Sequence, residues 1–141
     1  MKRVSFEGNV CSGKTLYLKL LDTNGYHVSW NHMANPTDPR VDLYFYENSP
    51  YSIKNVYGME VEPNWIPDII IYLYCHPVVC YERSKNRGGS LVEMKHLQGI
   101  HLKYEILCDE INCPVTLYKI NSHEDIESVY KNICDVINSV K

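Results

Sequence analysis

The sequence predicts an α/β fold in which a central parallel β-sheet is flanked by helices on both faces. Short apolar strands alternate with helical segments along the whole chain, which is typical of parallel strands joined by helical crossovers. Residues 68–74 are nearly continuous in apolar side chains, as expected for a strand that is buried on both faces. A glycine-rich loop joins the first strand to the first helix. In such a fold this loop is the expected place for an anion to bind.

Five strands are expected from apolar or alternating runs that are bounded by turn residues. The first strand ends at Gly8, and a loop punctuated by Pro36 and Pro39 separates the second strand from the third. Aliphatic and aromatic residues dominate these runs, as β-strands favour. The expected strands are residues 4–6, 26–30, 41–46, 68–74 and 115–120.

Four helices are expected between and after these strands. Gly25 ends the first helix, Pro77 begins the second, and Gly88 stops it. Ser122 is expected to cap the last helix, whose apolar residues recur at helical spacing. The expected helices are residues 15–21, 77–86, 91–108 and 122–140. Residues 47–65 contain two prolines and a glycine and show no clear pattern.

Length and composition indicate one globular domain, residues 1–141, in a reduced cytoplasmic compartment. The formal net charge of -3 gives no general attraction to nucleic acid or to an anionic membrane. No apolar stretch is long enough to span a bilayer. The six cysteines show no C-x-x-C spacing and are expected to be small packing residues. Four histidines lack metal-ligand spacing and are expected at the surface or as caps: His76, His96, His101 and His123.

Residues 8–15 match the pattern G-x-x-x-x-G-K-S/T between an apolar strand and a helix. In this pattern the glycines let the backbone wrap a phosphate, and the loop N–H groups point at the anion. Lys14 can reach the outer phosphates, and the Thr15 hydroxyl is placed to ligate Mg²⁺. The sequence therefore predicts a three-layer P-loop NTPase fold that binds a nucleoside triphosphate with Mg²⁺. The predicted binding residues are Gly8, Asn9, Val10, Cys11, Ser12, Gly13, Lys14 and Thr15.

Three segments of the chain, taken in order, resemble the deoxynucleoside kinase family. Residues 6–15 resemble the opening of these kinases, residues 67–88 the strand and helix before the family's lid, and residues 101–105 the helix after it. The lid itself would then occupy residues 83–95. The phosphate loop alone would fit many NTPases, so the order of the three segments carries the resemblance.

The resemblance implies a kinase that moves the γ-phosphate of ATP to the 5′-hydroxyl of a deoxynucleoside. Arg83 and Arg87 match the family's lid arginines, and their spacing places both on one helix face. A solvent-facing basic surface is the alternative interpretation. Glu47 matches the carboxylate that holds Mg²⁺ through water. The resemblance thus implies a catalytic set of Lys14, Glu47, Arg83 and Arg87, with Thr15 and Glu47 at the metal.

The half of the site that would bind the acceptor departs from the family pattern. Asn48 stands where the family has a catalytic arginine, and no acid follows the second strand closely. The candidate replacement bases are His32, Asp38 and Asp42. The alternative interpretation of each is an ordinary loop or capping residue. The aromatic residues that could stack on a base, or simply pack in the core, are Trp30, Tyr44, Tyr46, Tyr51 and Trp65.

Three functions remain open from the sequence. The first is the deoxynucleoside kinase, with a nucleotide and a deoxynucleoside as small-molecule partners and a homodimer as the family's expectation. The second is a nucleotide-binding regulatory or interaction protein derived from a kinase, which the loss of the arginine at Asn48 favours. The third is a nucleoside monophosphate kinase, whose extra phosphate needs arginines near the third strand, where the sequence offers Arg40.

Overall fold

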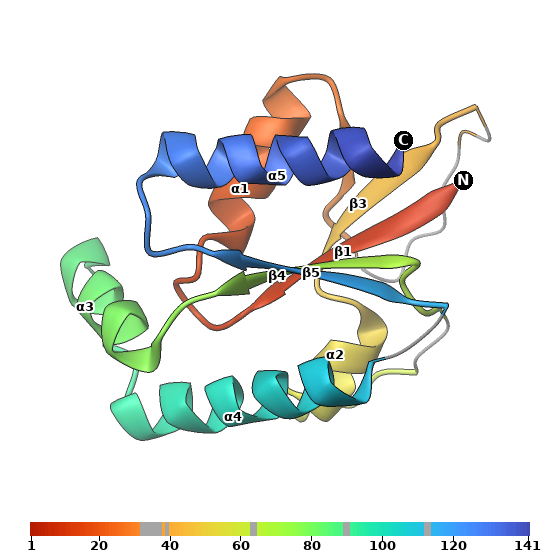
Figure 1. Cartoon of the computed structure of the whole chain (residues 1–141). Helices are drawn as coiled ribbons and strands as arrows, with labels where there is room; N and C mark the ends of the chain where they lie inside the picture. Colours follow the sequence, from red (N-terminus) through yellow and green to blue (C-terminus); the bar gives the residue numbers. More distant parts are fainter. Residues whose placement is uncertain (32–37, 39, 63–64, 89–90, 112–113) are drawn as a thin grey trace.

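In the computed structural model, five strands form a single sheet in the order β2-β3-β1-β4-β5, shown in Figure 1. The structure describes residues 1–31, 38, 40–62, 65–88, 91–111 and 114–141. Each pair of neighbouring strands is parallel, which confirms the predicted sheet. The strands are β1 (Lys2–Gly8), β2 (His27–Ser29), β3 (Leu43–Glu47), β4 (Ile69–Tyr74) and β5 (Thr116–Asn121).

Helices cover both faces of this sheet and complete the predicted three-layer fold. Figure 1 shows α1 and α5 on one face, α2 and α4 on the other, and α3 beyond the end of β4. The helices are α1 (Lys14–Thr23), α2 (Pro50–Asn55), α3 (Pro77–Arg87), α4 (Met94–Glu110) and α5 (Ile126–Val140).

The β4 strand is buried on both faces, as its apolar run predicts. Ile69, Ile71 and Leu73 belong to the core cluster that includes residues of α1 and α5. Ile70 and Tyr72 point the other way and join the cluster that includes residues of α4. Because successive side chains of a strand alternate between faces, this one strand holds the two helical layers together.

The structure corrects the start of two predicted helices and adds one helix that was not predicted. The last helix begins at Ile126, not at Ser122, because the Asp125 carboxylate caps it by accepting a 2.7 Å hydrogen bond from the Ser128 amide. The Ser122 hydroxyl instead donates to the carbonyl of Tyr74 at 2.9 Å. The helix α4 begins at Met94 rather than at residue 91. The short helix α2, which Ser49 caps, has no counterpart in the predicted elements.

The described part of the chain holds no helix that is long and apolar enough to cross a bilayer. Within the same residues, no group of three or more His, Cys, Asp or Glu side chains is suited to a metal ion. The described cysteines are free thiols, namely Cys11, Cys75, Cys80, Cys108 and Cys134.

Candidate functional site

A pocket of about 780 Å³ lies at the C-terminal ends of the strands. In parallel α/β sheets the loops that follow the strands converge at this edge, which is where ligands bind. One side of the pocket is residues 9–17, which are the phosphate loop and the start of α1. Trp30 after β2, Glu47 and Asn48 at the end of β3, and Arg83 and Arg87 of α3 also line it. The four residues predicted to be catalytic therefore share one pocket.

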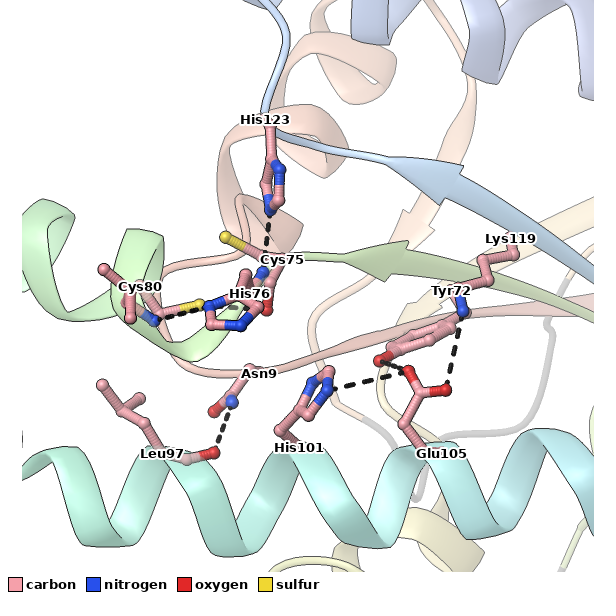
Figure 2. Close-up of polar contacts among 11 residues, drawn as sticks. Asn9, Tyr72, Cys75, His76, Cys80, Leu97, His101, Glu105, Lys119 and His123 are labelled. Carbon is pink, nitrogen blue, oxygen red and sulfur yellow. Dashed lines mark hydrogen bonds and ion pairs between the residues drawn. The ribbon is translucent and has the colours of Figure 1, made fainter.

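The phosphate loop needs glycine at two positions. Gly8 has a φ of +151°, and a Cβ there would lie 2.8 Å from the backbone carbonyl oxygen of Leu73. Gly13 has a φ of +105°, and a Cβ there would lie 2.7 Å from the Tyr17 ring. The Asn9 side chain ties the loop to α4 by donating a 2.8 Å hydrogen bond to the Leu97 carbonyl, drawn in Figure 2. The loop therefore has no room for a side chain at Gly8 or Gly13, and Asn9 ties it to α4.

The Lys14 ammonium lies against the loop rather than in bulk solvent. Its Nζ donates to the carbonyls of Gly8 and Asn9, the latter at 3.2 Å. It also lies 3.3 Å from the hydroxyl of Tyr57. Lys14 is 9% exposed, so its positive charge acts in a partly desolvated place, where it attracts an anion more strongly than in water.

Thr15 and Glu47 bring two oxygen ligands together at the pocket. The Thr15 hydroxyl donates a 2.7 Å hydrogen bond to Glu47 Oε1. Hydroxyl and carboxylate oxygens are the donors that Mg²⁺ prefers. This pair therefore fits the predicted metal, with Thr15 at the start of α1 and Glu47 at the end of β3.

The two arginines of α3 are held differently. The Arg83 guanidinium donates to the carbonyl of Cys11 at 3.1 Å and to the carbonyl of Ser122. It also lies 3.5 Å from Cys75 Sγ. A hydrogen bond from Cys80 and the charge of Arg83 lower the pKa of Cys75 to about 7, against the opposing effect of burial. Arg87, one turn further on, is exposed at the pocket edge.

Behind the phosphate loop, the carboxylate of Glu7 is buried and fully hydrogen-bonded. Glu7 is 1% exposed, and its Oε1 accepts from the Asn48 amide at 2.8 Å and from the Tyr104 hydroxyl at 3.1 Å. Its Oε2 accepts from the Ser49 backbone N–H at 2.9 Å. Asn48, where the resemblance implies an arginine, therefore holds Glu7 and brings no positive charge to the pocket.

Neither of the two candidate bases that the structure describes, Asp38 and Asp42, lines the pocket. Asp38 is paired with Arg40 at 3.0 Å, and neither residue lines the pocket. Asp42 precedes β3 at its N-terminal end, where its backbone carbonyl accepts from the Lys2 amide at 2.7 Å, so it lies at the opposite edge of the sheet. His32 lies outside the described residues. Among the described pocket-lining residues, the carboxylates are Glu47 and Glu124.

Of the five candidate stacking residues, three lie in the core, one lines the pocket and one is exposed outside it. Tyr44, Tyr46 and Trp65 form a buried cluster, which confirms the core interpretation for them. Trp30 is 49% exposed and lines the pocket. Tyr51 is exposed on α2.

The pocket-lining residues that carry no motif signal in the sequence include Ile53, Tyr57, Met59 and Glu124. The first three come from residues 47–65, where the sequence shows no periodicity. Glu124 follows β5, so the rule that ligands bind beyond the C-terminal ends of parallel strands could have identified it.

Two of the four histidines hold the start of α3, as Figure 2 shows. The Nδ1 of His76 accepts from the Val78 amide at 3.2 Å and caps the helix. The Nε2 of His123 accepts from the His76 amide at 2.8 Å. Burial lowers the pKa of His123, and the charge of Arg83 lowers it further. The capping role expected for histidine is therefore confirmed at His76.

The family model described as deoxynucleoside kinase matches residues 51–141. A solved structure of deoxyadenosine kinase from M. mycoides with bound dATP is 13% identical, with a TM-score of 0.71 over 98% of this chain and 100% of that chain. A second structure of deoxyadenosine kinase from M. mycoides, with the products dCMP and a flexible dCDP, is 15% identical, with a TM-score of 0.72 over 99% and 100%. No curated protein matches the chain.

Proposed function

The chain belongs to the deoxynucleoside kinase family, and on that premise we propose that it transfers the γ-phosphate of ATP to the 5′-hydroxyl of a deoxynucleoside. The observation that carries the proposal is the single pocket that holds Lys14, Thr15, Glu47 and Arg83 together. Phosphoryl transfer depends mainly on positioning the reactants and on neutralising the moving charge. These four side chains supply both.

On the donor side, each group has a distinct task. The amides of the phosphate loop and Lys14 would bind the outer phosphates of ATP. Thr15 and Glu47 would hold Mg²⁺, which when bound neutralises charge on the β- and γ-phosphates. Arg83 and Arg87 would then face the transferring group from α3, with Arg83 already fixed by the carbonyls of Cys11 and Ser122.

On the acceptor side, apolar and aromatic side chains line the rest of the pocket. Trp30, Ile53 and Met59 line it together with the phosphate loop, and small-molecule sites are built mainly of such surfaces with a few polar groups. A deoxynucleoside base is a flat, largely apolar group that suits this wall. The two M. mycoides structures contain deoxynucleotides, which supports the same class of ligand.

A nucleotide-binding regulatory or interaction protein is the second candidate. The observation that favours it is Asn48, whose amide is bound to Glu7 and brings no cation to the position of the family's arginine. Such cations can contribute orders of magnitude to the rate of phosphoryl transfer. A nucleoside monophosphate kinase is less well supported, because Arg40 is paired with Asp38 outside the pocket.

The test is ATP consumption against a panel of deoxynucleosides and nucleoside monophosphates, with MgATP affinity measured in parallel. We expect turnover with a deoxynucleoside, and its loss in Lys14→Ala. The matched control is Lys19→Ala, which removes an exposed lysine from the same helix and should leave turnover unchanged. If the protein binds MgATP but turns over none of the acceptors, the kinase proposal is overturned and the regulatory or interaction role is supported.

A further inference from the structure

Tyr57, in the turn after α2, contacts the phosphate loop at two atoms. Its hydroxyl lies 2.6 Å from the carbonyl oxygen of Gly8 and 3.3 Å from Lys14 Nζ. The Lys14 ammonium also lies over the Tyr57 ring, 5.7 Å from its centroid. One aromatic side chain therefore contacts both the first residue of the loop and the lysine near its end.

The direction of these hydrogen bonds follows from the groups involved. A phenol has one hydrogen to donate, a carbonyl only accepts, and an ammonium only donates. The Tyr57 hydrogen therefore goes to Gly8, and the Tyr57 oxygen accepts from Lys14. An ammonium over the face of a tyrosine ring gains a further attraction. The hydroxyl and the ring thus act on the same charge.

Tyr57 is itself held from the core. Its hydroxyl lies 3.3 Å from that of Tyr104, and the two rings meet edge to face with centroids 6.1 Å apart. Burial raises the pKa of Tyr104 well above its usual value, so this phenol stays protonated and can donate to the carboxylate of Glu7. The contact chain runs from buried Glu7 through Tyr104 and Tyr57 to Lys14.

The backbone of the turn also fixes Tyr57. Its amide donates to the Ser52 carbonyl at 3.2 Å, and the amide of Met59 donates to the Ile53 carbonyl at 3.0 Å. Gly58 between them has a φ of +70°, a conformation that glycine adopts without strain. These bonds fix the backbone of the turn that carries Tyr57.

We infer that Tyr57 is a positioning residue, whose hydroxyl and ring hold the Lys14 ammonium at the pocket wall where the outer phosphates of ATP would lie. The inference rests on the proposed function, because Lys14 is the group proposed to bind those phosphates. Positioning side chains of this kind reduce the cost of ordering a long flexible lysine when the ligand binds.

The test is a double-mutant cycle on MgATP affinity with Tyr57→Phe, Lys14→Ala and the double variant. We expect Tyr57→Phe to weaken MgATP binding about three- to tenfold, the range for one net hydrogen bond. In the Lys14→Ala background the same change should cost nothing further. AMP lacks the outer phosphates, so its affinity should be the same in Tyr57→Phe as in the wild type.

A matched control is Tyr130→Phe, which removes a hydroxyl bonded to Asn24 at 2.8 Å on α5, outside the pocket. It should leave both affinities unchanged, and urea denaturation checks that every variant is folded. The inference is overturned if Tyr57→Phe binds MgATP normally, if its loss is equally large without Lys14, or if AMP binding falls in parallel. If the wild type binds MgATP but shows no turnover, the proposed kinase activity is overturned and the positioning role of Tyr57 stands. If the wild type does not bind MgATP, both the kinase activity and the positioning role are overturned.

Discussion

The Thr15 hydroxyl donates a 2.7 Å hydrogen bond to the Glu47 carboxylate, which joins the start of α1 to the end of β3. Sheet register brings the two elements together, because Phe6 of β1 pairs with Glu47 while β1 leads into the phosphate loop. The relationship is therefore built into the fold rather than into a loose loop. A metal bound here would meet two ligands that are already oriented.

Glu47→Gln tests this pair. The amide keeps the shape of the side chain but removes the charge that would hold Mg²⁺, so we expect the Mg²⁺-dependent gain in ATP affinity to fall roughly tenfold or more. The measurement is ATP affinity across a Mg²⁺ titration. Glu110→Gln makes the same change at the exposed end of α4 and should leave the titration unaltered. An unchanged Mg²⁺ dependence in Glu47→Gln would remove Glu47 from the metal site.

Asn48→Ala tests the buried carboxylate of Glu7. The substitution leaves Glu7 Oε1 without the 2.8 Å donor from Asn48 and places alanine at a φ of +63°, which L residues other than Asn and Asp adopt at a cost. We expect a loss of about 1–3 kcal/mol in the free energy of unfolding, measured with urea. Asn55→Ala removes an exposed amide that bonds within α2 and should cost less. Equal losses would show that the Glu7 contact contributes nothing.

Arg83→Ala and Arg87→Ala should separate stability from activity. Arg83 bonds two backbone carbonyls and is partly buried, so its removal leaves those carbonyls without a donor and should lower both turnover and the free energy of unfolding. Arg87 is exposed, so its removal should lower turnover and leave unfolding within about 0.5 kcal/mol. Urea denaturation and ATP consumption on both variants check this. Equal destabilisation by the two changes would contradict the difference in their contacts.

Acidification should destabilise the fold through His123 and His101. Burial is the main cause that lowers the pKa of each, so the unfolded chain binds protons more readily than the folded one. The contribution of these histidines to the free energy of unfolding is therefore fully present above the unfolded pKa of about 6.5. It is lost as the pH falls below that value towards the folded pKa. His123→Gln should flatten that fall in urea midpoints measured at about pH 5.5 and 7.5. His96→Gln, on the exposed side of α4, is the control. If stability falls equally with pH in the wild type, His123→Gln and His96→Gln, His123 does not cause the loss.

Much of the layered fold could be predicted because each signal was local. The run at Ile69–Leu73 indicates a strand buried on both faces, and the phosphate loop marks the edge where the strands end. The caps were harder to predict. Ser122 and Asp125 are both good capping residues, and the choice between them depends on Ser122 bonding to Tyr74 across the sheet. That partner is distant in sequence, so no local pattern reveals it.

The same limit applies to the site. Lys14, Glu47, Arg83 and Arg87 carry motif signals, and the structure places them in one pocket. Tyr57 carries none, because its importance lies in contacts with Gly8 and Lys14 that arise only when the turn after α2 meets the loop in the folded chain. Asp42 was wrongly predicted as a candidate base for a related reason. A carboxylate beside a strand can reach the pocket only from the C-terminal end of that strand, and Asp42 precedes β3.

Gly8→Ala and Gly99→Ala should move stability in opposite directions. At Gly8 a Cβ would lie 2.6 Å from Ser12 Oγ and 2.8 Å from the Leu73 carbonyl oxygen, at a φ of +151°. The carbonyl belongs to β4 and cannot move aside cheaply, so we expect a loss of about 2 kcal/mol or more and weaker MgATP binding. At Gly99, inside α4, a Cβ would meet nothing within 4 Å. Alanine there should raise the free energy of unfolding by about 0.5–1 kcal/mol, because it restricts the unfolded chain. Urea denaturation measures both changes, and a Gly8→Ala protein with normal stability and nucleotide affinity would show that the loop tolerates a side chain where the structure leaves no room for one.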